Sequence, residues 1–224
     1  MFAVAIDGPS GAGKSSVARA AAEKIGFIYV DTGAIYRTVA LALTRMGVDL
    51  EDEAAIERAL PEIRIHMKRQ NGEQRMFWDD EDVSEAIRTA ENTKAASVVA
   101  AVPAVRAFLL ELQRRMAEEF PVIMDGRDIG TVVLPGAQVK IFLTASAEER
   151  ASRRMKQMES AGMPADYRTI LEEIRERDER DSNREIAPLK PASGAVMLDS
   201  SHSTKEQTVA KILAIIRQVQ EKQL

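Results

Sequence analysis

Short apolar runs recur along the chain, and glycine or polar residues follow each of them. The runs are Phe2–Ile6, Phe27–Val30, Val122–Met124, Val139–Leu143 and Ala195–Leu198. Because they show no alternation of apolar and polar positions, they indicate strands that are buried on both faces, as in parallel sheets.

Segments with apolar residues at helical spacing accompany these runs. They are Lys14–Ile25, Ala147–Met158, Tyr167–Arg184 and Thr204–Lys222. The chain therefore begins with a strand, a loop, a helix and a second strand, an order that predicts a right-handed crossover between parallel strands. We expect an α/β fold with a five-stranded parallel sheet flanked by helices.

The stretch from about Gly33 to Ala100 follows a different pattern. It contains helical segments at Tyr36–Met46 and Glu53–Leu60, and apolar runs at Ile63–Met67 and Arg75–Trp78 around the polar turn Arg69–Gly72. Two short runs around such a turn predict an antiparallel hairpin. An antiparallel hairpin inside a parallel core indicates a small inserted subdomain.

Composition narrows the class of protein. With 224 residues, 45% of them apolar, the chain can bury one sizeable core with an insertion, or two small domains. The net charge of -4 argues against non-specific attraction to nucleic acid. The absence of cysteine excludes disulfides and thiolate chemistry. No apolar run approaches the roughly 20 residues that span a bilayer, and the N-terminus lacks a signal-peptide pattern. We expect a cytoplasmic protein that binds neither nucleic acid nor membrane.

The residues after the first predicted strand, Gly8–Ser15, match the phosphate-binding pattern G-x-x-x-x-G-K-[ST] in full. The preceding strand and following helix supply the context that this P-loop requires. Its glycines let the backbone curl so that N–H groups point at phosphate oxygens, and the helix adds its positive end. In such a loop Lys14 reaches the β- and γ-phosphates, and the Ser15 hydroxyl is placed to ligate Mg²⁺. The motif predicts nucleoside triphosphate binding without naming the reaction.

Two other classes of P-loop protein fit less well. A regulatory GTPase needs the guanine-reading motif N-K-x-D, and the nearest approach, Asn92–Ala95, fails at two positions. A motor or transport ATPase usually has a larger chain and a longer apolar strand before its metal-binding aspartate. A small-molecule kinase therefore fits the sequence better than a regulatory GTPase or a motor or transport ATPase, although the P-loop motif alone excludes neither.

Charged clusters follow two of the predicted strands, at Asp31–Arg37 and Asp125–Asp128. Because the carboxyl ends of parallel strands meet at one edge of a sheet, both clusters should converge on the P-loop. Arginines at such a place neutralise a phosphoryl group in transfer. A third cluster, Arg175–Arg184, lies on a predicted helix and brings to one face Arg177, Asp181 and Arg184. Taken alone, that cluster is more simply interpreted as a solvated, salt-bridged helix.

Together these motifs resemble those of bacterial cytidylate kinases, a branch of the nucleoside monophosphate kinases. The resemblance covers essentially the whole chain and rests on Gly8–Ser16, Asp31–Arg37, Asp82–Ser84 with Ile87 and Arg88, Asp125–Val133, and Arg177–Leu189. It implies direct in-line transfer of the γ-phosphoryl group of ATP to CMP or dCMP, with Mg²⁺ as cofactor.

The resemblance also implies a domain organisation. The P-loop core would comprise residues 1–32 and 101–224, the monophosphate-binding insert residues 33–100, and a short lid residues 153–166. We expect a monomer whose partners are the small molecules ATP and CMP or dCMP.

Matched position by position, the resemblance assigns the acceptor site. Arg37 and Arg127 would hold the acceptor phosphate. Asp128 would accept a hydrogen bond from the cytosine amine, and the base would also be read by Ser97 and Arg106. The other expected CMP-binding residues are Thr32, Tyr36, Arg177, Asp181 and Arg184, with Tyr36, Arg177 and Asp181 against the sugar. The resemblance thereby reinterprets Arg177, Asp181 and Arg184 as functional residues. The other charged side chains of their predicted helix are still expected to be solvated.

On the donor side, the resemblance assigns ATP binding to Gly8, Pro9, Ser10, Gly11, Ala12, Gly13, Lys14, Ser15 and Ser16, with Arg153 and Arg154 closing from the lid. The expected catalytic residues are Lys14, Arg127, Asp128 and Arg177. Ser15 stands where many relatives have glycine, so it would hold Mg²⁺ directly or through water, with Asp125 as an outer partner. Two alternatives stay open: a kinase for another small acceptor, such as UMP or a metabolite, and a nucleotide-binding switch without catalysis.

Overall fold

The structure, a computed structural model, describes residues 1–70 and 73–222, which form two compact units. Unit 1 comprises Met1–Tyr29 and Phe120–Leu224, and unit 2 comprises Val30–Glu119.

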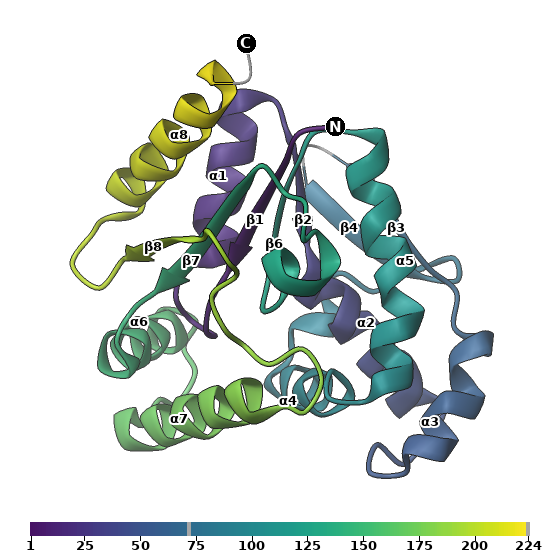
Figure 1. The fold of residues 1–224 in the computed structure, drawn as a ribbon. Coiled ribbons are helices and arrows are strands. Elements are labelled where there is room, and N and C mark those ends of the chain that lie inside the picture. The colour runs from purple at the N-terminus through teal and green to yellow at the C-terminus, as the bar shows by residue number, and fades with distance from the viewer. Residues whose placement is uncertain (71–72, 223–224) are drawn as a thin grey trace. The chain divides into compact units, whose positions relative to one another are not determined.

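Within the described residues, a five-stranded sheet contains the strands β1 (Ala3–Asp7), β2 (Ile28–Asp31), β6 (Val122–Gly126), β7 (Val139–Thr144) and β8 (Val196–Asp199). Their order is β2-β6-β1-β7-β8, and the ladders that join β6, β1, β7 and β8 are parallel (Figure 1). Every residue of β1 and β6 is buried, which explains their continuous apolar sequence. The predicted parallel sheet is confirmed.

Four helices of unit 1 match the predicted segments: α1 (Lys14–Ile25), α6 (Ala147–Ser160), α7 (Tyr167–Asn183) and α8 (Lys205–Glu221). Helix α1 ends at Ile25, and the next residue, Gly26, has a left-handed backbone and donates its N–H to the Ala22 carbonyl. Helix α8 begins with a capping box formed by Thr204 and Gln207. Helices α1 and α8 lie side by side against the sheet (Figure 1), and the apolar core of unit 1 is shared between them and the strands.

One helix boundary changes a prediction. Helix α7 ends at Asn183, and Arg184 adopts non-helical backbone with φ −56° and ψ 135°. Arg184 therefore does not belong to the helical face that carries Arg177 and Asp181, because the chain has already left the helix.

Unit 2 contains α2 (Thr32–Arg45), α3 (Glu53–Ala59), η1 (Leu60–Glu62), β3 (Ile65–Gln70), β4 (Glu73–Trp78), β5 (Glu81–Asp82), η2 (Ala86–Arg88), α4 (Ala90–Val99) and α5 (Pro103–Glu119). Strands β3 and β4 pair antiparallel, so the predicted hairpin is confirmed. Two residues of its predicted turn, 71 and 72, lie outside the described residues. Strand β5 adds a third strand that was not predicted.

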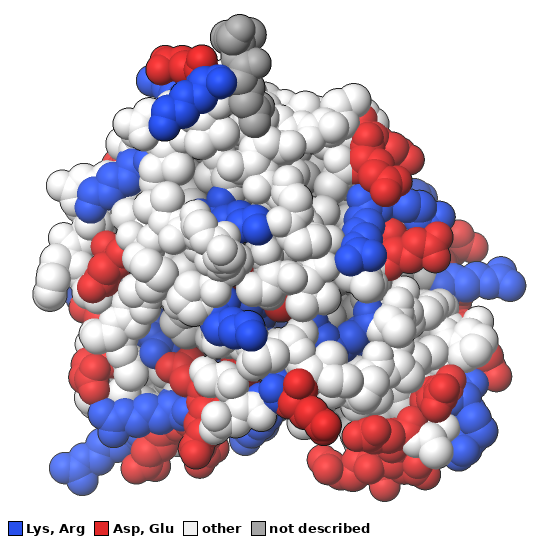
Figure 2. Space-filling model, in the orientation of Figure 1, with Lys and Arg blue, Asp and Glu red and all other residues white. Residues whose placement is uncertain are grey.

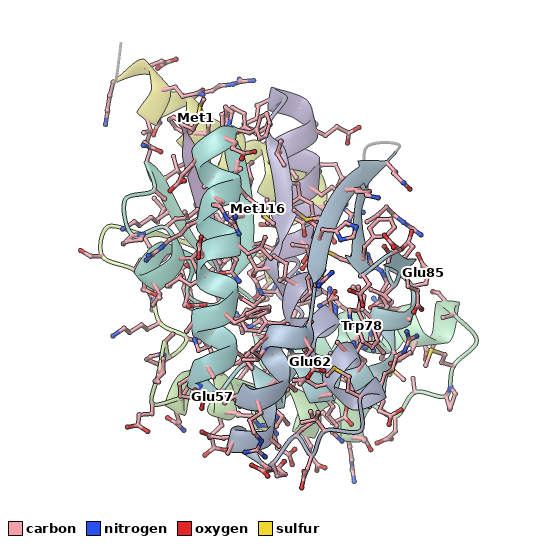
Figure 3. All side chains as sticks on the ribbon, turned by 90° about the vertical axis from the view of Figure 1, so that its right-hand side faces the viewer. Met1, Glu57, Glu62, Trp78, Glu85 and Met116 are labelled. Atoms are coloured by element: carbon pink, nitrogen blue, oxygen red, sulfur yellow. The ribbon has the colours of Figure 1, made fainter. Side chains whose placement is uncertain are left out.

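Local capping moves the start of α2. The Asp31 carboxylate accepts a hydrogen bond from the Ala34 N–H, so the helix begins at Thr32, before the Tyr36 start that the apolar spacing indicated. Trp78, which is labelled in Figure 3, is the last residue of β4. The Arg45 guanidinium lies 5.9 Å from the centre of the Trp78 ring, which places a cation over this aromatic face.

In the described part of the chain, no single helix combines the length and apolar character needed to span a bilayer. Helices α4 and α5 pass that test only as a pair, and they are bent by 99° at the break between them. Figure 2 shows basic and acidic side chains interleaved over α6 and α7, the mixed-sign surface expected from the sequence of these helices.

Candidate active site

The loop between β1 and α1 is held from outside through its carbonyl groups. The carbonyls of three loop residues accept hydrogen bonds, at 2.7, 2.9 and 3.2 Å respectively, from the side chains of Lys14, Arg150 and Ser200. The accepting residues are Pro9, Ser10 and Ala12. A loop whose carbonyls are bound on one side can present its N–H groups to an anion on the other.

Gly8 is required by the way in which this loop leaves β1. Its φ of 149° lies outside the range that L side chains favour, and a Cβ atom there would lie 1.9 Å from the Leu143 carbonyl oxygen of β7. No side chain fits this approach of the loop to the sheet. Gly13 also has positive φ, 89°, but a Cβ there would meet no atom within 4 Å.

Lys14 lies in an electropositive environment. Burial, together with the charges of Arg127 and Arg177, lowers the pKa of its ammonium group to about 7, and the charges of Asp125 and Asp181 oppose the shift. The side chains of two arginines and two aspartates thus act on the ammonium group of Lys14 at the phosphate loop. Such a site favours a polyanion.

Arg127 and Asp181 form the central ion pair of this region. Arg127 Nε donates to Asp181 Oδ2 at 2.8 Å, and both side chains are largely shielded from solvent. Burial disfavours the charged form of Asp181, yet the charges of Arg127, Arg177 and Arg184 hold the pKa of its carboxyl below the usual range. One carboxylate thus faces three arginines, so the cluster keeps an excess of positive charge.

Asp125 links the loop to the end of β6. Its Oδ2 accepts a hydrogen bond from Ser15 Oγ at 3.0 Å, and its Oδ1 accepts one from Tyr29 Oη at 2.8 Å. A hydroxyl and a carboxylate beside a phosphate loop are the hard oxygen ligands that Mg²⁺ takes together with phosphates and water. The described residues contain no group of three or more His, Cys, Asp or Glu that could hold a metal by themselves. The Ser15 hydroxyl and the Asp125 carboxylate therefore fit a Mg²⁺ ion that binds together with a nucleotide.

Asp128 opens an unusual turn. It precedes the π-helical turn η3 (Ile129–Val133), and its backbone carbonyl accepts hydrogen bonds from Val132 and Val133 at 2.8 and 3.2 Å. The residue is 4% exposed. π-Helical turns are rare and occur frequently at functional sites.

The two arginines predicted for the lid both lie on α6. Arg153 donates to the Glu149 carboxylate at 3.0 Å and to the Ser200 carbonyl at 2.6 Å. Arg154 is exposed and donates to the Gln157 side chain at 3.1 Å. Arg153 thus contacts the same serine that binds the phosphate loop.

In unit 2, Arg37 is held close to the start of α2. Its Nη2 donates to Asp31 Oδ2 at 3.1 Å, and the absence of a side chain at Gly33 leaves room for the guanidinium. Among the described residues its buried Nε has no hydrogen-bond partner. A charged donor group that is only partly satisfied is suited to an anionic ligand.

The other predicted acceptor residues of unit 2 lie on its helices. The Arg106 guanidinium of α5 lies 5.7 Å from the centre of the Tyr36 ring of α2, and it donates to the Ala100 carbonyl at 3.1 Å. Ser97 of α4 and Thr32 of α2 are buried. Unit 2 therefore brings together the arginine and tyrosine that the resemblance assigned to the acceptor.

Sequence comparisons show the family to which the chain belongs. The family model described as cytidylate kinase matches residues 4–218. The chain belongs to the cytidylate kinase family. Its relatives include the cytidylate kinase of Pelotomaculum thermopropionicum, 50% identical over 94% of each chain. Another is the cytidylate kinase of Actinobacillus succinogenes, 50% identical over 95% of this chain and 97% of its own.

Among solved structures, an uncharacterized protein from Eubacterium ventriosum aligns with a TM-score of 0.51 and 13% identity. The alignment covers 97% of this chain and 99% of the other. At this identity the likeness concerns the fold alone.

Sequence reasoning missed two residues whose hydrogen bonds support the candidate site of this cytidylate kinase family member. Asn92 was considered only as part of a failed guanine motif, yet its Nδ2 donates to the carbonyls of Arg37 and Ile87 at 2.9 and 3.0 Å. Asp7 accepts hydrogen bonds from the N–H groups of Ile129 and Gly130, both at 2.7 Å. Asp7 ends the buried run of β1 and therefore needed a partner, which was a signal in the sequence, whereas Asn92 follows exposed residues inside α4 and gave no such signal.

The prediction that all other charges of α7 are solvated is wrong for Asp178. Its carboxylate forms a bidentate ion pair with Arg150 of α6, a residue that is only 4% exposed. Arg150 also donates to the carbonyls of Ala145 and Ser10. The helical spacing of α7 alone did not reveal this pair, since its partner lies on another helix.

Proposed function

We propose that this protein transfers the γ-phosphoryl group of ATP to CMP or dCMP, giving ADP and CDP or dCDP. The observation that carries the proposal is the concentration of positive groups around the phosphate loop, where Arg127 and Arg177 act on Lys14 and three arginines face Asp181. Family membership supports the choice of cytidylate as the acceptor. A purely regulatory nucleotide switch would not need this second cluster.

The donor side is proposed to be the loop Gly8–Ser16. Its N–H groups would bind the β- and γ-phosphates of ATP, and Lys14 would exchange its contact with the Pro9 carbonyl for phosphate oxygens. Arg153 and Arg154 would close over the triphosphate as part of a lid at residues 153–166. Mg²⁺, which would be held by Ser15 directly or through water with Asp125 nearby, supplies charge neutralisation on the phosphates.

The acceptor side is proposed to comprise the residues that the resemblance to cytidylate kinases assigns to CMP. Arg37 and Arg127 would bind the acceptor phosphate, and Asp128 would accept a hydrogen bond from the cytosine amine. The base and sugar would be completed by Ser97, Arg106, Thr32, Tyr36, Arg177, Asp181 and Arg184. We further propose residues 33–100 as the monophosphate-binding insert and residues 1–32 and 101–224 as the core, in a monomeric cytoplasmic enzyme.

The mechanism follows from the charges of the acceptor and the site. The acceptor is already an ionised phosphate near neutral pH, so no strong general base is required. Lys14, Arg127 and Arg177 would neutralise charge that develops in the transition state, and no covalent enzyme intermediate is needed. Closure of the insert and lid would exclude water, which otherwise competes as the acceptor.

A coupled assay of ADP release with CMP, dCMP, UMP, AMP and shikimate tests this function. We expect turnover with CMP and dCMP that greatly exceeds release without an acceptor. Strong turnover with UMP and none with CMP would show that the acceptor is another monophosphate. Nucleotide binding without acceptor-dependent ADP release would identify a switch instead.

The role of Asp128 is tested separately from the reaction itself. We expect Asp128→Ala to raise the KM for CMP strongly while the Kd for ATP, measured by titration, stays near that of the wild type. Asp199→Ala, which also removes a carboxylate at the end of a strand of unit 1, is the control and should change neither value. Equal loss of CMP use and ATP binding in Asp128→Ala contradicts a base-reading role.

A further inference from the structure

Asp7 is a buried carboxylate that joins the end of β1 to the start of η3. It is 3% exposed and immediately precedes Gly8, the first residue of the phosphate loop. Its Oδ1 accepts a hydrogen bond from Ile129 N, and its Oδ2 accepts one from Gly130 N, both at 2.7 Å. Such short contacts are typical of hydrogen bonds to an ionised acceptor.

These two hydrogen bonds satisfy the start of a turn that lacks a cap of its own. The Asp128 side chain at the N-cap position of η3 makes no capping hydrogen bond. The first N–H groups of a helical turn have no partner within the turn, so a buried turn needs an acceptor from elsewhere. Asp7 supplies that acceptor from a position more than a hundred residues away in sequence.

The packing around Gly130 fits this arrangement closely. A Cβ atom at Gly130 would lie 3.1 Å from Ala192 Cβ, 3.3 Å from Asp7 Oδ2 and 3.4 Å from Lys140 Cδ. Only a glycine lets the turn approach the carboxylate without displacing a neighbour.

The charges that face Asp7 oppose each other. Burial is the largest cause that raises the pKa of its carboxyl, and the charge of Asp128 adds to it; the two backbone hydrogen bonds and the charge of Lys14 oppose the shift, and the resulting pKa is about 6. The ionised form thus prevails at neutral pH but is held at a cost in folding stability. Residues that are kept at such a cost are frequently functional.

The carbonyl groups of the phosphate loop, by contrast, make their side-chain hydrogen bonds with residues other than Asp7. These residues are Lys14, Arg150 and Ser200. Loss of the Asp7 carboxylate would therefore release η3 and the two residues before it, Arg127 and Asp128, more than the loop.

We propose that Asp7 is a positioning residue whose ionised carboxylate fixes η3 and thereby sets Arg127 and Asp128 relative to the phosphate loop. The inference rests on the proposed function, in which these two residues bind the acceptor. Asp7 itself touches neither substrate nor the transferred group.

The substitution Asp7→Asn tests the proposal, since it keeps the volume but replaces one acceptor oxygen by an amide donor. We expect kcat/KM for CMP to fall about 10- to 100-fold, the loss typical when a residue that orients a metal ligand is replaced. The Kd for ATP should change by less than about threefold. Asp52→Asn, which alters an exposed N-cap of α3 in unit 2, is the matched control and should leave both values unchanged.

The pH profile separates positioning from a merely structural role. The ratio of kcat/KM for CMP between wild type and Asp7→Asn should decrease as the pH falls through about 6, because wild-type Asp7 then gains a proton. Ionisation of the substrate phosphate affects both proteins equally and cancels in this ratio. A ratio near one at all pH values would overturn the proposal, as would equal losses of CMP use and ATP binding.

Two further measurements decide the question even if Asp7→Asn fails to fold. In wild-type protein the ¹⁵N–¹H resonances of Ile129 and Gly130 should titrate together near pH 6, and unshifted resonances would refute the role. Gly130→Ala, which pushes the turn from the carboxylate, should reproduce the loss in CMP use with ATP binding retained, and a fully active Gly130→Ala would also refute it. If the wild type does not phosphorylate CMP, the proposed function fails, whereas the two amide resonances still report whether Asp7 fixes the turn.

Discussion

Among single residues, Gly8 and Gly13 show two different reasons for a glycine in the same loop. Both have positive φ, but only at Gly8 would a Cβ collide with the backbone of a neighbouring strand. At Gly13 the cost of a side chain is conformational, about 1–2 kcal/mol for left-handed backbone. A sequence motif treats these positions alike, and the structure separates them.

We therefore predict that Gly8→Ala destabilises the protein far more than Gly13→Ala does. The collision with Leu143 requires the loop or β7 to shift, whereas Gly13 faces open space. Urea unfolding measures the difference, with Gly13→Ala as the matched control. Equal losses of stability would show that the loop relaxes freely at both positions.

Asp7 yields a prediction about stability and pH at the same scale. Folding raises the pKa of the Asp7 carboxyl from 3.8 to about 6. At a pH between these two values the carboxyl is therefore protonated in the folded protein and ionised in the unfolded chain. The stabilising contribution of this proton is complete below about pH 4 and is lost as the pH rises through about 6. Relative to Asp7→Asn, the free energy of unfolding of the wild type should fall by roughly 1 kcal/mol between about pH 5 and pH 7. Urea unfolding of both proteins at each pH measures this difference. If the free energy of unfolding of the wild type rose relative to that of Asp7→Asn as the pH increased, the prediction would be contradicted.

At the scale of elements, α6 and α7 are joined to each other and to the phosphate loop through one buried side chain. Arg150 of α6 binds the Asp178 carboxylate of α7 and the carbonyl of Ser10. Asp178 lies beside Arg177 and one turn before Asp181, which face the positive cluster. Arg150 thereby links α7, which carries proposed catalytic residues, to the phosphate loop.

We predict that Asp178→Asn lowers the free energy of unfolding by about 1–3 kcal/mol, because it leaves the buried Arg150 guanidinium without its counter-charge. The exposed ion pair between Arg175 and Glu148 joins the same two helices, so Glu148→Gln is the matched control. That variant should unfold like the wild type. If both variants behave alike, burial of Arg150 does not govern the strength of its ion pair.

At the scale of the whole molecule, stability should depend on a core that is distinct from the charged site. In unit 1 this core is formed by β1, β7, α1 and α8 and includes the fully buried Ile6, Val4 and Ile212. Polar residues of the site lie elsewhere: Asp7 and Asp125 at the carboxyl ends of β1 and β6, and Ser15 in the first turn of α1. Function and folding can therefore be perturbed separately.

We predict that Ile212→Ala lowers the free energy of unfolding by about 2–5 kcal/mol, the usual cost of an emptied core position. At a temperature where the variant stays folded, its kcat/KM for CMP should match that of the wild type. Ile215→Ala on the same helix removes a partly buried side chain and should cost less. A large loss of activity in folded Ile212→Ala would mean that the core and the site are coupled.

Much of the fold could be predicted from the sequence, since local patterns encode it. The strand β1, the phosphate loop and α1 follow from an apolar run, glycines and helical spacing, and the hairpin β3–β4 follows from two runs around a turn. Boundaries were less accurate where a side chain caps a helix, as Asp31 does for α2. The assigned roles of the CMP-binding residues remain predictions, which the experiments above address.

By itself, the sequence determined the phosphate loop, the parallel sheet and the family, because each depends on residues that are neighbours in the chain or recur in a fixed order. Only the tertiary structure decided that Asp7 holds η3, that Arg150 pairs with Asp178, and that Ser200 binds the loop carbonyl of Ala12. These contacts join residues far apart in sequence and leave no periodic signal. Their physical reason is that a buried charge or carbonyl must find a partner, and folding brings that partner from whichever segment lies next to it.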